Sequence, residues 1–271
     1  SYKRCVDVLS QKQDIVQGIN EAPSDYQNLI TYDHVSFSYY SGNALTDVSF
    51  NILPGQTIGV IGGTGSGKTT LINLIPRFYD VTEGEIRIKD LPIKSYKFKD
   101  LRNMIGIVPQ QATLFGGTIR ENMQWGNPHA TDEEIYKALE LSQSKEFVDK
   151  MTKGLDTYIE QGGKNVSGGQ RQRLTIARAL VKKPEILILD DSASALDFAT
   201  DAKLRKALST LNMTVIIVSQ RVSALMHADS IVVLSHGEVV GQGTHDMLMN
   251  TCDVYQEIVM SQMGGGQNDE E

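Results

Sequence analysis

One short glycine-rich segment constrains the fold of this chain more than any other. The segment GGTGSGKTT carries the pattern G-x-x-x-x-G-K-[ST], in which Gly62, Gly67, Lys68 and Thr69 occupy the defining positions. The apolar run TIGVIG before it predicts a buried strand, and KTTLINLIPRFY after it predicts a helix. In this strand–loop–helix context the pattern forms a phosphate-binding loop (P-loop). We therefore expect the chain to bind a nucleoside triphosphate; the alternative is an ordinary glycine-rich turn.

The residues of this loop suit the binding of phosphate and a metal ion. Glycines let backbone N–H groups approach phosphate oxygens, and the helix that follows presents its positive end to the anion. Lys68 is expected to reach the β- and γ-phosphates, and the hydroxyl of Thr69 to ligate Mg²⁺. The other candidate nucleotide contacts in the loop are Thr64, Gly65, Ser66 and Thr70.

A second segment, ILILDD, ends an apolar run with two adjacent acids. Four apolar residues before a carboxylate predict a buried strand that delivers an acid to a site. In P-loop proteins an aspartate in this place holds Mg²⁺, directly or through water, and here it would be Asp190. The neighbouring Asp191 then lies where a second acid could act on the attacking water.

Strand and helix patterns predict an α/β fold with three parts. Strand patterns dominate from Thr31 to the hairpin GEIRIKDLPI, which predicts an antiparallel β subdomain. Residues from about 112 to 184 have helical character and predict an inserted α-helical subdomain. The runs EILILD and MTVIIVS are typical of parallel strands covered on both faces. We expect a P-loop NTPase core with a mostly parallel sheet.

Composition excludes several other classes of protein. The net charge of −7 and the pI of about 5.3 argue against a nucleic-acid-binding protein. Cys5 and Cys252 have no metal-like spacing, and we expect two reduced thiols. No apolar stretch approaches the ~18 residues that would indicate a membrane-spanning helix. The five histidines are scattered and offer no alternative catalytic group.

The segment VSGGQRQRLTIARAL adds a second potential anion-binding helix end. Ser167 is a favourable N-cap, and the two glycines after it expose N–H groups at the start of a helix. The segment resembles the signature motif of the ATP-binding-cassette (ABC) family, and the similarity extends from residue 31 to about 260. In that family two nucleotide-binding domains meet head to tail around ATP. The resemblance implies that Ser167, Gly169 and Gln170 contact ATP bound to a partner domain.

Other positions match the family pattern in order and spacing. Tyr39, in VSFSY, matches the aromatic residue that stacks on adenine. Gln110, in IVPQQATLF, matches the glutamine that contacts Mg²⁺ and water and relays the nucleotide state to the membrane domains. Asp197, in SALD, matches the residue that crosses the dimer interface.

Two further segments resemble those of ABC exporters. YKRCVDVLSQKQDI is similar to the connection after the last membrane helix, and QATLFGGTIRENMQWG to the segment that touches the coupling helices. The expected organisation is a linker from a preceding membrane domain (1–28), a nucleotide-binding domain (29–262) and a disordered acidic tail (263–271). The partners implied are a second nucleotide-binding domain and the transmembrane domains of an exporter, at the cytoplasmic face of the cell membrane.

Two departures from the family pattern fall on the same site. Active members carry Glu after the metal-binding aspartate, where this chain has Asp191, shorter by one carbon. They also carry His where this chain has Gln220. Unlike His, Gln cannot be protonated to a positively charged form near neutral pH. We expect slow hydrolysis at the site built on this chain's own P-loop, with Asp191, Gln220 and Gln110 as its catalytic residues.

The signature motif is intact, which favours an asymmetric pair with a different partner chain. The alternatives left open are a homodimer with two slow sites, a soluble ABC ATPase of DNA repair or chromosome organisation, and an ATP-gated interaction module without hydrolysis.

Overall fold

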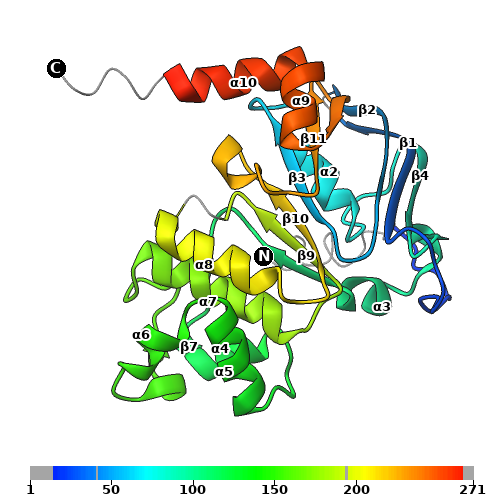
Figure 1. Ribbon diagram of the computed structural model, residues 1–271. Coiled ribbons are helices and arrows are strands. Elements are labelled where there is room, and N and C mark those ends of the chain that lie inside the picture. Colours follow the sequence, from blue (N-terminus) through cyan, green and yellow to red (C-terminus); the bar gives the residue numbers. More distant parts are fainter. Residues whose placement is uncertain (1–14, 41, 193–194, 265–271) are drawn as a thin grey trace, which may run out of the picture.

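The computed structural model describes residues 15–40, 42–192 and 195–264, with a six-stranded sheet at its centre (Figure 1). The strands are β3 (Thr57–Gly62), β6 (Ile105–Val108), β9 (Ile186–Asp190), β10 (Thr214–Val218), β11 (Ser230–Ser235) and β12 (Glu238–Gly243). Their order is β12-β11-β3-β10-β9-β6, and only the β11–β12 pair is antiparallel. The carboxyl ends of β3, β9 and β10 therefore meet at one edge, where parallel sheets bind ligands.

The central strands are apolar on both faces because each face packs against a different layer. On β10, Val215 and Ile217 belong to the hydrophobic core shared with the helices, whereas Ile216 and Val218 belong to the core shared with the second sheet. This alternation has the two-residue period of a strand. It explains why the sequence shows a continuous apolar run there.

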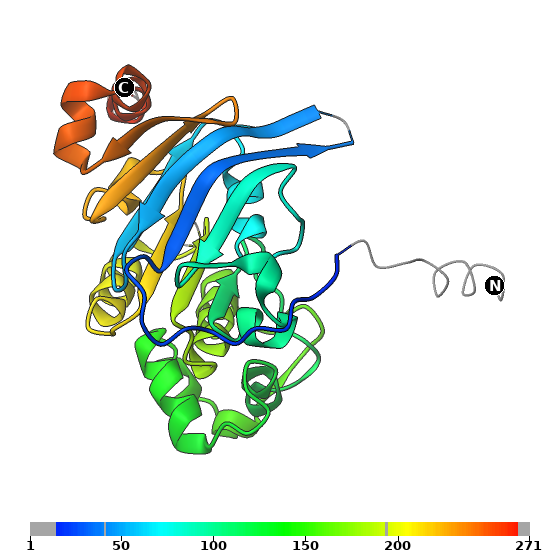
Figure 2. The same ribbon diagram turned by 90° about the vertical axis from the view of Figure 1, so that its right-hand side faces the viewer.

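An antiparallel sheet forms the second layer, as the strand patterns predict. Its strands are β1 (Ile30–Tyr39), β2 (Gly42–Ile52), β4 (Glu83–Ile88) and β5 (Leu91–Pro92), in the order β2-β1-β4-β5. The β4–β5 turn is at Lys89–Asp90, and both residues have positive φ, as a tight hairpin requires. Figure 2 shows this sheet in front, with the helical part of the chain below it.

The predicted helical subdomain lies at one end of the central sheet (Figure 1). Its elements are β7 (Gly117–Thr118), α4 (Ile119–Gln124), α5 (Asp132–Leu141), α6 (Lys145–Asp149), η2 (Gly154–Asp156), β8 (Tyr158–Ile159) and α7 (Gly168–Val181). Capping boxes begin α4, α5 and α7, so sequence-local hydrogen bonds define where these helices start. The buried face of α5 carries Ile135, Ala138 and Leu139.

The remaining helices surround the central sheet. They are α2 (Lys68–Leu74), α3 (Phe98–Asn103), α8 (Phe198–Leu208), α9 (His245–Thr251) and α10 (Asp253–Gly264), with the short helices η1 (Ile93–Ser95) and η3 (Val222–Ala224). The helix expected to reach Tyr79 ends at Leu74, because Pro76 has no N–H to continue the helical hydrogen bonds. Helix α10 runs two residues into the tail expected from residue 263.

The segment before β1 is held by backbone hydrogen bonds. The N–H of Gly18 donates to the carbonyl of Tyr96 at 2.9 Å, and the N–H of Asn20 donates to that of Ser95 at 2.9 Å. Residues 15–25 contain no helix, and the rest of the short helix expected near the N-terminus lies outside the described residues, as does Cys5. Cys252 is a buried free thiol.

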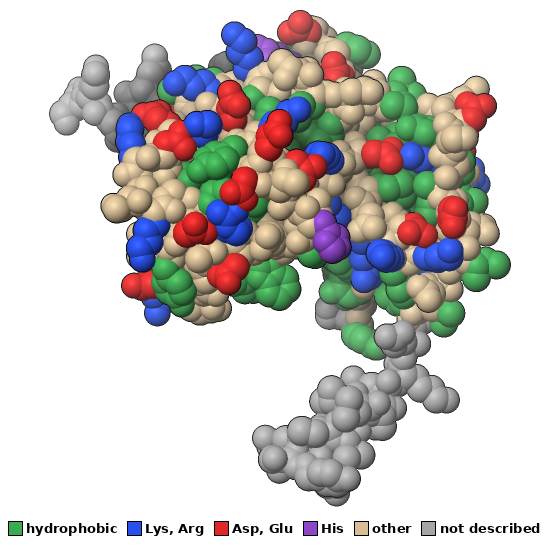
Figure 3. Space-filling model, turned by 90° about the horizontal axis from the view of Figure 1, so that it is seen from below, with side chains coloured by type: hydrophobic (Ala, Val, Ile, Leu, Met, Phe, Trp, Pro, Cys, Tyr) green, Lys and Arg blue, Asp and Glu red, His purple; other side chains and the backbone are tan. Residues whose placement is uncertain are grey.

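The surface of the described part is mixed in charge on the face shown in Figure 3, where acidic and basic side chains are interspersed. Within residues 15–40, 42–192 and 195–264, no helix combines the length and the apolar character needed to cross a membrane.

Candidate nucleotide-binding site

Close packing forces glycine at two positions of the P-loop. A Cβ atom at Gly62 would lie 2.2 Å from the carbonyl oxygen of Leu234, which is far inside van der Waals contact. Gly67 caps α2 with φ of 101°, a conformation that L side chains rarely adopt. The two glycines therefore let the loop turn tightly between β3 and α2.

The ammonium group of Lys68 lies over this loop. Its Nζ donates to the carbonyl oxygens of Gly62 at 2.8 Å and Gly63 at 2.7 Å. Burial lowers the pKa of Lys68, and the charges of Asp190 and Asp191 act in the opposite direction. A half-buried ammonium held by neutral carbonyls gains strongly from an anion, so a phosphate oxygen is a favourable partner here.

A hollow of about 330 Å³ opens beside the loop. It is lined by Tyr39, Gly42, Asn43, Ala44 and the residues from Gly65 to Thr70. The ring of Tyr39 stands edge-on to Phe37 and Tyr79, at centroid distances of 4.7 and 5.4 Å. These neighbours fix its orientation, while 38% of its surface stays exposed. A ring held in this way can stack on a base. Thr64 is exposed on the same loop.

Asp190 and Asp191 lie at the carboxyl end of β9. Strand β10 lies between β9 and β3, the strand that leads into the P-loop. Burial, and then the charge of Asp191, raise the pKa of the Asp190 carboxyl, while Lys68 lowers it. A half-buried carboxylate with a raised pKa is stabilised when a cation binds beside it. Asp191 has φ of 44°, and its N–H donates to the carbonyl of Val218 at 2.8 Å.

Gln110, which follows β6, reaches the acid pair from the next strand. Its Nε2 donates to Oδ2 of Asp191 at 3.2 Å. The sequence assigned Gln110 to the metal and Asp191 to the attacking water, and the structure brings the two side chains into contact. They lie 81 residues apart in the chain.

The residues at this edge suit a hard, oxygen-ligated cation. Among the described residues there is no group of three or more His, Cys, Asp or Glu side chains placed to hold a metal. Thr69, Gln110 and Asp190 together offer hydroxyl, amide and carboxylate oxygens. A cation here would take its other ligands from water and phosphate, as Mg²⁺ does.

Gln220 follows β10 and is exposed. The preceding Ser219 is buried, and its N–H donates to the carbonyl of Val60 on β3 at 3.2 Å, which fixes the start of this loop beside the P-loop strand. The carbonyl of Gln220 accepts a hydrogen bond from Nε2 of Gln262 at 2.7 Å. Sequence reasoning missed Gln262, because no motif or local pattern marks it.

The signature helix α7 starts away from the P-loop hollow. Ser167 Oγ accepts from the N–H of Gln170 at 3.2 Å, and Oε1 of Gln170 accepts from the N–H of Ser167 at 3.0 Å. Ser167 and Gly168 are exposed, and neither lines the hollow beside Tyr39. The side chains thus cap the helix, and the first N–H groups of α7 lie at the surface.

Asp197 begins α8, which follows the strand of the acid pair. Hydrogen bonds from the hydroxyl and the N–H of Thr200, at 2.7 and 2.9 Å, lower the pKa of its carboxyl. It is exposed, so its N-cap role leaves it accessible to a second chain. Ser194, the first residue of the SALD motif, and the preceding Ala193 lie outside the described residues.

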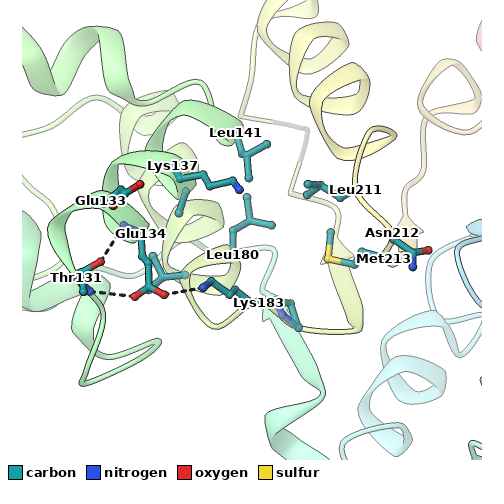
Figure 4. A pocket seen from close by; sticks show the side chains of 13 residues that line it. Thr131, Glu133, Glu134, Lys137, Leu141, Leu180, Lys183, Leu211, Asn212 and Met213 are labelled. Atoms are coloured by element: carbon teal, nitrogen blue, oxygen red, sulfur yellow. Dashed lines mark hydrogen bonds and ion pairs between the residues drawn. The ribbon is translucent and has the colours of Figure 1, made fainter. Parts of the chain in front are cut away.

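A larger hollow of about 570 Å³ lies between α5, the end of α7 and residues 211–213 (Figure 4). Lys183 on its rim pairs with Glu134 at 2.6 Å. None of the residues that line it belongs to the P-loop or to the acid pair. The P-loop residues expected to bind phosphate line the smaller hollow instead.

Comparison with known proteins gives a consistent result. A family model for ABC transporters matches residues 45–194. The ABC transporter ATP-binding protein YfiB of Bacillus subtilis is 46% identical over 237 residues, which are 87% of this chain and 41% of that protein. A Staphylococcus aureus protein, whose name assigns it to multidrug export ATP-binding/permease proteins, is 41% identical over 93% of this chain and 44% of its own length.

The fold has a close match among solved structures. A bacterial Atm1-family ABC exporter with ATP bound superposes with a TM-score of 0.90 and 31% identity, over 96% of this chain and 47% of that chain. This match confirms the expected α/β fold class with its antiparallel and helical subdomains. The chain spans less than half the length of these three proteins.

Proposed function

This chain belongs to the ABC transporter family as an exporter-type nucleotide-binding domain, and from that premise we propose that it binds ATP with Mg²⁺ and energises transmembrane export. The observation that carries the proposal is the grouping of Lys68, Asp190 and Tyr39 around the P-loop. Their chemistry matches the phosphates, the cation and the base of one nucleotide. The expected location is the cytoplasmic face of the cell membrane, beside the transmembrane domains of the exporter.

Each residue group has one task in this site. The P-loop N–H groups and Lys68 bind the phosphate chain, and the ring of Tyr39 stacks on the base. Thr69, Gln110 and Asp190 would hold Mg²⁺, which neutralises charge on the β- and γ-phosphate oxygens when bound. The hydrogen bond from Gln110 to Asp191 keeps the acid oriented toward the water position.

Hydrolysis at this site is slow in our proposal. Asp191 is about 1.5 Å shorter in reach than Glu, and Gln220 offers the γ-phosphate a neutral hydrogen-bond donor in place of a histidine. Both departures concern the attacking water and the γ-phosphate. Neither concerns the binding of ATP, so the site holds its nucleotide for long times.

The exposed start of α7 serves a second nucleotide-binding domain. Ser167, Gly169 and Gln170 complete the site on that partner, while the partner's corresponding helix completes the site on this chain. Because the departures at Asp191 and Gln220 both fall on the site built on this chain's P-loop, while its signature motif is intact, we infer a different partner chain with a competent P-loop site. ATP binding closes the pair, and hydrolysis, mostly on the partner, reopens it.

A second candidate function follows from the departures at Asp191 and Gln220. If the site of this chain never turns over, the chain is an ATP-gated interaction module. Single-turnover hydrolysis separates the two: a slow first-order loss of bound ATP identifies an enzyme, and unchanged ATP over many hours identifies the module. If this chain forms ATP-dependent dimers in the absence of any other chain, it is a homodimer with two slow sites.

The proposal is tested by replacing Lys68 with alanine and measuring ATP affinity by calorimetry. Charge-assisted hydrogen bonds to two phosphates are worth about 3 kcal/mol or more together, so K68A should weaken ATP binding by about 100-fold. The control is Lys99→Ala, an exposed lysine on α3 outside the P-loop hollow. Equal affinities of K68A and K99A would refute the assignment of the site.

A further inference from the structure

Helix α10 reaches the loop that carries Gln220, although the two are separated by more than 40 positions in the sequence. At the end of α10 the carboxamide of Gln262 makes two hydrogen bonds to this loop. Its Nε2 donates to the carbonyl of Gln220 at 2.7 Å, and its Oε1 accepts from the N–H of Val222 at 2.9 Å. One side chain thus holds the backbone on both sides of Arg221.

These two bonds supply partners that the loop does not supply itself. Val222 is the first residue of η3, and Arg221, which precedes it, makes no side-chain capping bond. The first N–H groups of a short helix need a partner from outside the helix. Gln262 provides that partner from another element, and at the same time satisfies the carbonyl of Gln220. The pairing of one donor and one acceptor defines the orientation of the intervening peptide planes.

The loop is therefore held at two points on either side of Gln220. On the strand side, the N–H of Ser219 donates to the carbonyl of Val60 at 3.2 Å. On the other side, the carboxamide of Gln262 makes its hydrogen bonds to the carbonyl of Gln220 and the N–H of Val222. Contacts on both sides fix the backbone at Gln220, and with it the position and direction of the Cα–Cβ bond from which its exposed side chain extends.

We propose that Gln262 is a positioning residue, which orients Gln220 toward the γ-phosphate of ATP bound to this chain. This inference rests on the proposed function, because it needs Gln220 to contact the γ-phosphate. It adds a link between the C-terminal helix and the nucleotide. Any ligand or neighbouring domain that displaces the end of α10 would then change how well the site distinguishes ATP from ADP.

The test measures the affinities of ATP and ADP, with Mg²⁺, for the full 271-residue chain and four variants. The ratio of the two affinities reports the γ-phosphate contact and does not depend on hydrolysis. The variants are Gln262→Ala, Gln220→Ala, the double variant, and Gln256→Ala. Gln256 is a matched control in the same helix, since its Nε2 donates to the carbonyl of Met249 at 2.9 Å, outside the Gln220 loop.

We expect Q220A to lower the ratio by about tenfold, the size of one hydrogen bond to a charged group. Q262A should lower it to a similar extent, the double variant no further, and Q256A not at all. A general loss of stability would weaken ATP and ADP binding equally and leave the ratio unchanged. Gln262→Glu is a second variant: it keeps the acceptor for Val222, loses the donor to Gln220, and should resemble Q262A.

Each other outcome overturns the inference. If Q220A lowers the ratio and Q262A does not, Gln262 has no positioning role, and the proposed function stands. If the two losses add in the double variant, Gln262 acts by a route that does not pass through Gln220. If Q220A leaves the ratio unchanged, Gln220 does not contact the γ-phosphate, and both the inference and that part of the proposed function are wrong.

Discussion

Replacing Asp191 with glutamate should restore fast hydrolysis at this chain's own site. The backbone of Asp191 is held, because its N–H donates to the carbonyl of Val218 at 2.8 Å and its φ is 44°. The main chain therefore does not advance to compensate for a short side chain. The missing reach of about 1.5 Å remains in full.

The size of the effect follows from this distance. A misplacement of about 1 Å in a reacting group costs on the order of 100-fold in rate, which is about 2.7 kcal/mol of activation free energy. We expect D191E to increase the single-turnover rate by about 100-fold. Gln110, 3.2 Å from the present carboxylate, is placed to orient the longer side chain as well.

The assay is release of phosphate from one bound ATP in the assembled transporter, with the partner's own P-loop inactivated so that only this site reports. Asp191→Asn is the control, because it keeps the size of the side chain and removes the base. It should be no faster than the unmodified chain. A D191E rate equal to that of the unmodified chain, or a D191N rate equal to that of D191E, would refute the reasoning.

Two further predictions concern the P-loop and the buried acid. Gly62→Ala should destabilise the chain by about 1–3 kcal/mol, because the new Cβ would lie 2.2 Å from the carbonyl oxygen of Leu234. The control is Gly63→Ala, which should be tolerated because its Cβ would have no atom within 4 Å. Equal melting temperatures of the two variants in calorimetry would contradict this. For Asp190, burial raises the pKa in the folded state, so the carboxylate lowers stability as the pH rises above the unfolded value of 3.8. Asp190→Asn should therefore raise the melting temperature of the nucleotide-free chain at pH 7, with a smaller gain near pH 4. A lower melting temperature at pH 7 would show the sign to be wrong.

Elements with strong local signals could be predicted from the sequence. The left-handed turn at Gly67, the hairpin turn at Lys89–Asp90 and the N-cap at Ser167 depend on backbone preferences and short-range hydrogen bonds. The apolar runs of β9 and β10 follow from burial on both faces. The turns and the N-cap are decided by forces that act within a few residues, and the apolar runs indicate burial without specifying the packing partner.

Contacts between distant segments could not be predicted in the same way. The bond between Gln110 and Asp191 depends on the order of strands in the sheet, and local patterns do not specify that order. Asp191 has a left-handed conformation and bonds to Val218 on the neighbouring strand, and no local pattern marks either feature. The pairing of Gln262 with the loop at Gln220 depends on where α10 packs against the rest of the chain.

The central claim is that each ATP is held by the P-loop of one chain and the signature helix of another. Its most direct test places Ser167→Arg in the assembled transporter and measures two quantities: ATP photo-crosslinked to this chain, and total turnover. The exposed start of α7 would then carry a bulky cation where the partner's nucleotide must approach. We predict that S167R abolishes turnover while this chain still binds ATP at its own P-loop. Loss of ATP from this chain's P-loop, or turnover at the unmodified rate, would contradict the account.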